Sequence, residues 1–177
     1  MQLELPELGT ERLRLARFTS ADVTSSYLET LNDSWYMRFS NQRYTQHNKL
    51  TCENYRTNLA ESGGGLLACV ETEHGDLACT ISLSYSQQHR WVDIGLLAVK
   101  GYEGLGVGSE AWGAVVEWLS VQPNVRKITA GTSAGNLPMI SIIQGSGLQV
   151  EGRRNAQEIV EGTPTDVLLF GKLLKGF

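Results

Sequence analysis

Three glycines at alternate positions, Gly104, Gly106 and Gly108, stand between an apolar run and a stretch whose apolar residues recur with helical spacing. Glycine lets a backbone approach an anion closely, and the first free N–H groups of a helix favour negative charge. The segment 103–109 therefore predicts a phosphate cradle at the start of an amphipathic helix expected over residues 108–121.

The spacing of these glycines excludes two common phosphate-binding loops. A dinucleotide site has GxGxxG directly after its first strand, whereas the spacing here is GxGxG and antiparallel strands are expected before it. A Walker A loop requires a lysine, which the segment 103–109 lacks. A glycine turn that merely joins a strand to a helix stays open as an alternative when the loop is taken alone.

The cradle belongs to a predicted series of strands and helices. Polar and apolar residues alternate over 12–17, as in a strand. Thr19 and Asp22 form a capping pattern for a helix expected to reach about Leu31, and Thr51 is the expected cap of a second helix. The other expected elements are strands over 66–71, 77–85, 91–99 and 125–132, a helix over 138–146, and a strand pair over 149–158 and 165–175. This order indicates a mixed sheet with helices on its faces.

The composition favours an ordinary soluble protein. The chain has 177 residues, of which 41% are hydrophobic and 19% charged, so we expect one domain over 1–177 with a sizeable core. A net charge of −4 without a basic cluster argues against nucleic acid, and no apolar run is long enough to span a membrane. Because Glu4 and Glu7 stand where a signal peptide is basic or apolar, we expect a cytoplasmic protein.

The cysteines and histidines give no metal pattern. Cys52, Cys69 and Cys79 are an odd number without a CxxC pair, so we expect reduced, structural thiols and neither disulfides nor a zinc site. His74 and His89 fall in expected turns and are too separated in sequence to indicate a metal site.

Several motifs together resemble one family. The segments DIGLLAV (93–99) and GLGVGSEA (104–111) resemble the acetyl-CoA motif of the GNAT acetyltransferases, particularly the RimJ/RimL-like branch. TERLRL (10–15), NLPMI (136–140) and SGLQVEG (146–152) are similar to further segments of that branch. The resemblance implies an α+β fold, namely a mixed, mostly antiparallel sheet of about seven strands flanked by about four helices.

The resemblance implies acetyl-CoA as the acetyl donor. By that resemblance the backbone groups of Leu97 and Val99 pair with the pantetheine arm, the loop binds pyrophosphate, and Asn136 reaches the arm from the other side. The expected cofactor-binding residues are Leu97, Ala98, Val99, Glu103, Gly104, Leu105, Gly106, Val107, Gly108, Ser109 and Asn136. The family usually has Arg or Gln at position 103 and often a basic residue at 105. We therefore expect Glu103 to turn to solvent and the cradle to act through backbone N–H groups.

Acetyl transfer to an amine requires a base and a proton donor for the leaving thiolate. Asp93 stands where some relatives carry a glutamate base, although a solvent-facing or turn-fixing acid is the alternative. Many relatives have a tyrosine at the position of Ile143, so Ser141 is the candidate acid, with water or a backbone N–H as the alternative. The expected acceptor-binding residues are polar and aromatic groups in irregular chain: Tyr36, Arg38, Asn41, Arg43 and His47. His47 is also an alternative base.

Two functions are consistent with these residues. The first is direct transfer of acetyl from acetyl-CoA to a primary amine, either a small amine such as an amino-sugar nucleotide or a protein N-terminus. The second is a catalytically silent module that binds acyl-CoA on the same fold. Arg38 or Arg43 facing the acceptor's phosphate would favour the nucleotide, and an open acidic groove would favour a peptide. A homodimer is open, because symmetric dimers are the commonest soluble oligomers.

Overall fold

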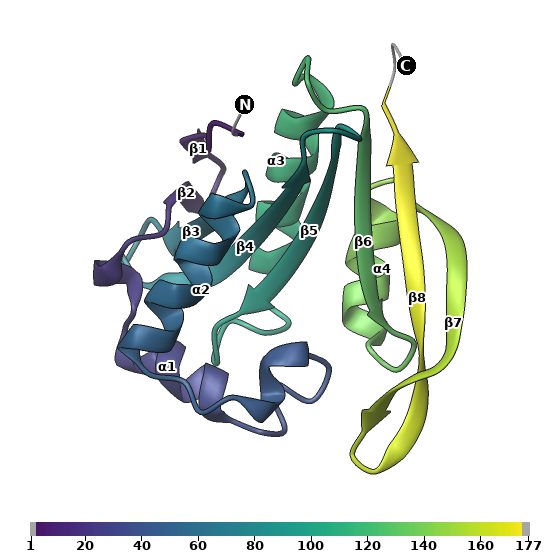
Figure 1. Cartoon of the computed structure of the whole chain (residues 1–177). Helices are drawn as coiled ribbons and strands as arrows, with labels where there is room; N and C mark the ends of the chain where they lie inside the picture. Colours follow the sequence, from purple (N-terminus) through teal and green to yellow (C-terminus); the bar gives the residue numbers. More distant parts are fainter. Residues whose placement is uncertain (1–2, 175–177) are drawn as a thin grey trace.

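A computed structural model describes residues 3–174, which form one eight-stranded sheet with helices on both faces (Figure 1). The strand order is β1-β2-β3-β4-β5-β6-β8-β7, and only β5 and β6 pair in parallel. The strands are β1 Leu8–Gly9, β2 Leu13–Arg17, β3 Gly65–Glu71, β4 Leu77–Ser86, β5 Trp91–Ala98, β6 Lys127–Ser133, β7 Gln149–Val160 and β8 Thr163–Leu173. The predicted mixed, mostly antiparallel sheet is confirmed, with β1 as an additional short strand. Lys175, which was expected to end the last strand, lies outside the described residues.

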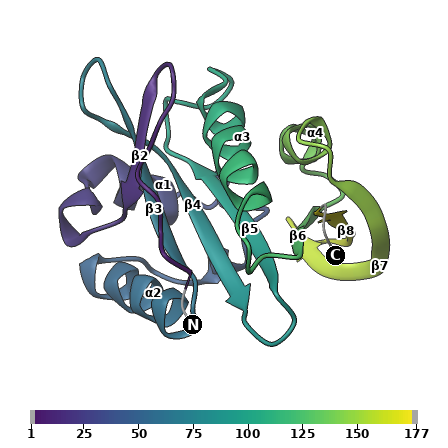
Figure 2. The same cartoon turned by 90° about the horizontal axis from the view of Figure 1, so that it is seen from above.

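Four α-helices cover the two faces of the sheet (Figure 2). They are α1 Ser25–Asn32, α2 Lys49–Glu61, α3 Val107–Ser120 and α4 Leu137–Gly145, and two 3₁₀ turns, η1 Ser20–Asp22 and η2 Asn41–Tyr44, accompany them. Helix α3 crosses from β5 to β6 on one face with α4 beside it, while α1 and α2 lie on the other face. The parallel β5–β6 pair requires such a crossover helix.

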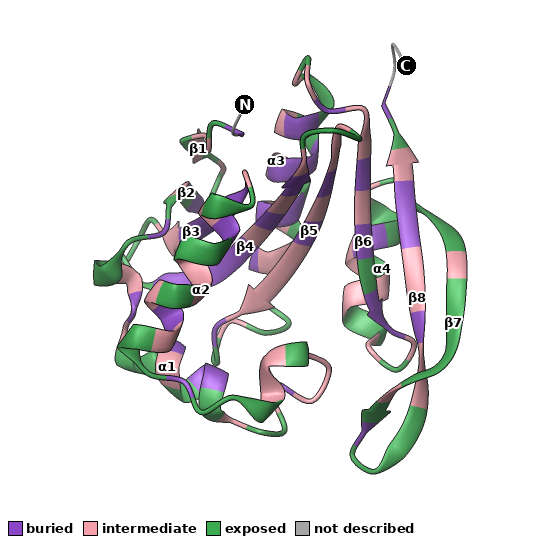
Figure 3. Cartoon of the chain, in the orientation of Figure 1, coloured by how far each residue is buried: buried purple, intermediate pink, exposed green. Residues whose placement is uncertain are grey.

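The core follows the alternation of apolar side chains (Figure 3). Leu13 and Leu15 of β2 are fully buried and share a cluster with Ala111 and Val115 of α3. A second cluster, which includes Tyr27 and Leu59, lies under α1 and α2. Strand β7 is exposed along most of its length, because it is the edge strand of the sheet.

The N-terminal helix predictions need two corrections. Asp22 does accept a hydrogen bond from the Thr19 N–H (2.7 Å), but the turn ends at once, and α1 begins separately with Thr24 as its cap. The second helix is capped by Asn48, whose side chain accepts from the Thr51 N–H (3.0 Å) while Thr51 Oγ1 accepts from the Asn48 N–H (2.9 Å). Thr51 is therefore the third helical residue of a reciprocal cap, and its prediction as the cap itself was wrong.

The pairing of β5 with β6 is short. Only Trp91 with Lys127, Val92 with Ile128 and Asp93 with Thr129 are register partners. Beyond Asp93 the two strands diverge, while β5 stays paired with β4 as far as Ala98, and Figure 1 shows the gap widening toward the glycine loop. The separation of the two strands therefore begins just after Asp93.

Among residues 3–174, no helix is both long enough and apolar enough to cross a membrane.

Candidate active site

Two of the alternate glycines adopt a left-handed backbone conformation, and the third packs closely against β5. Gly104 and Gly106 have φ values of 74° and 81°, in the region that side chains rarely adopt, and Gly106 caps α3. Gly108 packs on β5, where an added Cβ would lie 3.1 Å from Leu96 Cδ2. The first backbone bond of the helix runs from Glu110 N–H to the Gly106 carbonyl, so the N–H groups of residues 107–109 precede the helical bonds. Loop and helix thus offer an anion site.

Glu103 is exposed, as expected, but it does not extend freely into solvent. Its carboxylate accepts hydrogen bonds from the Gly101 N–H (2.6 Å) and from the Tyr36 hydroxyl (3.1 Å). Hydrogen bonds from its own N–H, from Gly101 and from Tyr36 outweigh slight burial and hold the pKa of Glu103 below its usual value. The negative side chain is therefore folded back on the turn that precedes the cradle.

The backbone of Val99 is already engaged within the protein. Its N–H donates to the Ala78 carbonyl (2.8 Å), and its carbonyl accepts from the Tyr102 N–H (2.9 Å). The prediction that Val99 offers free backbone groups to a pantetheine arm was wrong, because the residue still belongs to the ladder between β4 and β5.

The same ladder decides which backbone groups of β5 face the gap. Alternate residues of an antiparallel strand point their N–H and C=O groups to the same side. Leu97 is opposite Thr80 in register, so its groups point to β4 as those of Val99 do. Leu96 and Ala98 then present their groups to the gap. Ala98, which was predicted as a cofactor-binding residue, faces the gap, whereas the backbone groups of Leu97 do not, and Leu96 was not among the predicted residues.

Asp93 lies at the point where β5 and β6 separate. Thr129 Oγ1 donates a hydrogen bond to Asp93 Oδ2 (2.7 Å), which leaves Oδ1 for another partner. Burial raises the pKa of the Asp93 carboxyl above its ordinary value, and the hydrogen bond from Thr129 opposes part of this shift. A partly buried carboxylate with a raised pKa is suited to accept a proton near neutral pH.

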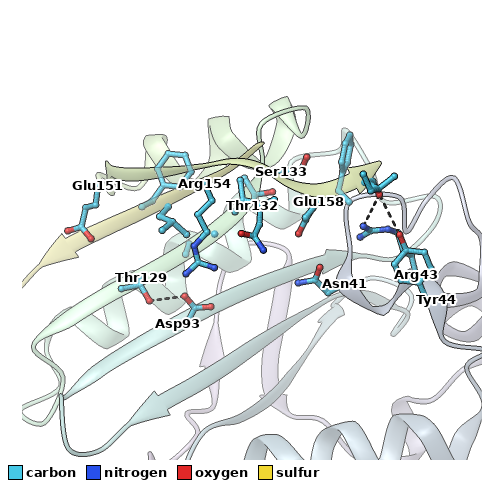
Figure 4. A pocket seen from close by; sticks show the side chains of 18 residues that line it. Asn41, Arg43, Tyr44, Asp93, Thr129, Thr132, Ser133, Glu151, Arg154 and Glu158 are labelled. Atoms are coloured by element: carbon cyan, nitrogen blue, oxygen red, sulfur yellow. Dashed lines mark hydrogen bonds between the residues drawn. The ribbon is translucent and has the colours of Figure 1, made fainter. Parts of the chain in front are cut away.

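Asp93 opens onto a cavity of about 720 Å³ (Figure 4). Its wall comes from five segments of the chain: Phe39, Asn41, Arg43, Tyr44, Asp93, Thr129, Ala130, Gly131, Thr132, Ser133, Glu151, Arg154, Gln157, Glu158, Ile159, Val167, Leu169 and Phe170. This volume is that of a small-molecule site. Segments that are far apart in sequence therefore meet beside the proposed base.

Two of the five predicted acceptor residues line this cavity, namely Asn41 and Arg43. The Arg43 guanidinium donates to the carbonyls of Ser40 (2.6 Å) and Ile159 (3.0 Å), so it also fastens η2 to β7. The charge of Arg43 faces the cavity, but much of its donor fork is used within the protein.

The other three predicted acceptor residues do not line the cavity. Tyr36 donates to Glu103, and Arg38 stacks on Trp35, with its Cζ 3.9 Å from the ring centroid. His47 is buried, and its Nε2 lies 3.2 Å from the Gln42 carbonyl oxygen. His47 is therefore a structural residue that holds the turn after η2, and it does not fit the alternative role of base.

The residues of α4 lie away from the cavity wall. Ser141 is exposed, and Ile143 is fully buried in the core, so a tyrosine at position 143 would not reach solvent. Asn136 caps α4 at the end of β6, across the gap from β5, and its Nδ2 donates to Thr132 Oγ1 (3.1 Å). Its amide oxygen is left for the N–H of an arm in the gap.

Sequence reasoning missed several polar residues of the cavity. Glu158 Oε2 and Ser133 Oγ are buried without a hydrogen-bond partner among the described residues, and the Arg154 side chain projects into the cavity (Figure 4). Thr129 could have been found by pairing the two predicted strands in parallel, since it is the neighbour of Asp93 in that register. No comparable signal marked Arg154 or Glu158, because β7 has one register shift between Val150 and Gly152 and another between Arg154 and Glu158.

Two further groups of residues lie outside the cavity: the three cysteines and one set of potential metal ligands. Cys52, Cys69 and Cys79 are buried and free of disulfides. Within residues 3–174, one group of potential ligands comes together, Glu71, Glu73 and His74, in the exposed turn after β3. The Glu71 carboxylate there accepts from the His74 N–H (2.9 Å), a hydrogen bond that stabilises the turn.

The sequence of residues 12–149 matches the family model described as the acetyltransferase (GNAT) domain. The chain belongs to the GNAT acetyltransferase family. This confirms the family that the glycine loop and its flanking motifs predicted. No curated protein sequence matches the chain significantly.

Solved structures of other GNAT proteins share the fold. A GNAT-family acetyltransferase from Bacillus anthracis is 18% identical, with a TM-score of 0.80 over 95% of this chain and 98% of that chain. RimL, a ribosomal L7/L12 alpha-N-protein acetyltransferase in complex with coenzyme A, is 14% identical, with a TM-score of 0.82 over 95% and 97%. A spermidine N-acetyltransferase from Vibrio cholerae in complex with CoA and spermine is 15% identical, with a TM-score of 0.78 over 93% of this chain and 96% of that chain.

Proposed function

We propose that this chain is an acetyl-CoA-dependent N-acetyltransferase that transfers acetyl directly to a primary amine. One observation carries the proposal: Asp93 faces the cavity where β5 and β6 separate, on the same strand that leads to the glycine loop. A donor whose pyrophosphate occupies the loop and whose arm occupies the gap would present its thioester beside Asp93. The acceptor would reach the same point from the cavity.

In the proposed reaction Asp93 accepts the proton that the attacking amine loses, directly or through one water molecule. The amine nitrogen attacks the thioester carbonyl carbon, the C–N bond forms, and the C–S bond breaks with its electron pair on sulfur. Water then protonates the thiolate, because Ser141 is exposed on α4 and does not line the cavity. Thr129 holds one oxygen of Asp93 and so directs the other toward the amine.

The cavity wall favours a cationic acceptor, because it carries three carboxylates and two arginines. Arg38 is stacked on Trp35 outside the cavity, and the donor fork of Arg43 is largely used by backbone carbonyls. Neither of these two arginines presents the free fork that a nucleotide sugar would require, and Arg154, which projects into the cavity, is the arginine there that could contact a phosphate. The carboxylates of Asp93, Glu151 and Glu158 line the cavity and would attract an ammonium group. A small amine or a protein N-terminus is the acceptor class that we propose, and the RimL and spermidine enzymes among the structural relatives act on these classes.

Thiol release from acetyl-CoA with a panel of small amines, N-terminal peptides and amino-sugar nucleotides tests this function. We expect release with an amine or peptide, and Asp93→Asn should lower kcat by roughly 100-fold or more. Asp93→Asn should also flatten the acidic limb of the pH profile, because the raised pKa of Asp93 sets where the base form appears. CoA binding without turnover of any acceptor would instead identify a silent acyl-CoA-binding module, and failure to bind CoA would remove both functions.

The thermal stability of Asp93→Asn shows whether this variant is folded. The folded-state pKa of Asp93 is raised, so its stabilising contribution is present below the unfolded pKa and is lost as pH rises through the folded pKa. At neutral pH, Asp93→Asn should therefore unfold at a temperature equal to or above that of the wild type. A thermal melt at two pH values checks this sign.

A further inference from the structure

The cofactor loop is fastened by a residue that lies about 90 positions earlier in the chain. Arg12, directly before β2, donates from Nη1 to the Leu105 carbonyl (2.9 Å). Its Nε donates to Glu110 Oε2 (2.7 Å) and its backbone N–H to Glu110 Oε1 (2.8 Å). Thr10 Oγ1 also donates to Glu110 (2.6 Å). The segment before β2 thus holds both the loop and the first turn of α3.

The remaining nitrogen of this guanidinium lies at the cradle itself. A Cβ added at Gly106 would lie 3.4 Å from Arg12 Nη2, so Nη2 is beside the residue that caps α3. Nη2 has no hydrogen-bond acceptor within residues 3–174, whereas Nε and Nη1 are both used. The arginine is therefore fixed by the protein through Nε and Nη1, while Nη2 keeps two N–H groups for another partner close to Gly106.

The cradle has no cationic side chain of its own. The segment 103–109 contains Glu103 and no Lys or Arg. Lys100, which precedes the segment, forms an ion pair with Asp33 (2.8 Å), the residue that ends α1. Arg12 is therefore the cation that contacts the loop. Arginine is also the side chain whose planar fork best suits a phosphate.

We propose that Arg12 binds the pyrophosphate of CoA through Nη2 and supplies the positive charge that the loop lacks. Glu110 keeps the guanidinium in place: burial raises the pKa of the Glu110 carboxyl, but hydrogen bonds from Thr10 and Arg12 outweigh this and hold it below its ordinary value. This inference rests on the proposed function, in which the loop holds CoA.

Calorimetric titration with CoA, without any acceptor, tests the role of Arg12. Arg12→Gln should raise the Kd of CoA by at least about tenfold, and Arg12→Lys should give a smaller increase because it keeps the charge without the fork. Arg14→Gln is the matched control, since it removes an equal charge from an exposed position of the same segment, and it should change the Kd less than about twofold. Arg12→Gln should also weaken the salt dependence of CoA binding, which a merely structural role would not change.

A second variant separates charge from loop anchoring. Glu110→Gln keeps one acceptor oxygen for Thr10 and the Arg12 backbone N–H but replaces the oxygen that accepts from Arg12 Nε with an amide donor. The guanidinium keeps its charge but loses part of its anchor, so the Kd of CoA should rise less than for Arg12→Gln. Equal losses for Arg12→Gln and Glu110→Gln, or an unchanged Kd for Arg12→Gln, would overturn the inference. Absence of CoA binding by the wild type would instead overturn the proposed function.

Discussion

The proposed cofactor side, formed by β5, the glycine loop and α3, and the proposed acceptor side, formed by the cavity, meet at Asp93 but are assembled differently. The cofactor side comes from one continuous stretch, β5 with the loop and α3 that follow it, and Thr10, Arg12 and Tyr36 join it from elsewhere through hydrogen bonds. The acceptor cavity draws on five stretches, from η2, β5, β6, β7 and β8. The first depends on local backbone geometry, whereas the second depends on how distant strands pack.

The two sides also differ in how their charged side chains are hydrogen-bonded. On the cofactor side the ionic groups are engaged by the protein: Glu103 is bonded to Gly101 and Tyr36, and Glu110 to Arg12. In the cavity, Glu158 has a buried oxygen without a protein partner. Polar groups that are buried and unpaired within a protein are where a ligand contributes most. The comparison therefore predicts that changes to the loop backbone damage the cofactor side, where Arg12 is the charged side chain proposed to bind, and that side-chain charge changes in the cavity damage the acceptor side.

Gly106→Val should have the largest effect. Valine at the φ of 81° is strained by about 1–3 kcal/mol, and relief of that strain would move the N–H groups of residues 107–109 out of alignment. We expect the KM for acetyl-CoA to rise up to about 100-fold, with the acceptor KM little changed. Steady-state kinetics with each substrate varied in turn measures both values.

Gly113→Ala is the control for that variant. Gly113 lies within α3, and an added Cβ would meet nothing within 4 Å. Alanine there should stabilise the helix by about 0.5–1 kcal/mol and leave the KM for acetyl-CoA unchanged. If Gly106→Val left the KM for acetyl-CoA unchanged as well, the cradle would not depend on the left-handed turn.

Glu158→Gln should affect the acceptor side alone. A hydrogen bond to a charged group contributes about 1.5–3 kcal/mol, so loss of the carboxylate should raise the acceptor KM by about tenfold. The KM for acetyl-CoA should stay within about twofold. Glu161→Gln, at an exposed position in the turn after β7, is the matched control and should be silent. Equal increases in both KM values would show that the two sides are not separable at Glu158.

Thr129→Val should give the smallest change, a shift in pH dependence. Without the hydroxyl, the charged form of Asp93 loses a hydrogen bond (2.7 Å) and its pKa rises further. We expect the acidic limb of kcat/KM to move to higher pH by about one unit, with the plateau reduced only a few-fold. A shift to lower pH, or none, would contradict the proton-accepting role of this pair.

The sequence could predict the cofactor side because its signals are local. The glycines at 104, 106 and 108 act on their own backbone and on the adjacent strand, and Asp93 is on that strand. The predicted backbone contacts of Leu97 and Val99 were wrong for a reason that no motif contains: the ladder with β4 continues through residue 99 and fixes which groups point to the gap.

The acceptor side was predictable only in part. Asn41 and Arg43 belong to a polar stretch that composition indicated, but Tyr36 and His47 from the same stretch form contacts within the protein. Glu158 comes next to a register shift in β7. An irregularity of this kind changes which side chains face inward, and alternation along the strand cannot reveal it.

The short pairing between β5 and β6 also affects how the molecule partly unfolds. Three register pairs join the strands β1 to β5 to the unit of β6, β8 and β7, whereas β6 pairs with β8 along seven residues. The sheet therefore consists of two cooperative parts that meet along a narrow line, and the least costly partial unfolding separates them there. Such an opening would uncover unpaired inner strand edges, which another chain can join. A ligand that bridges the gap would close this route to aggregation.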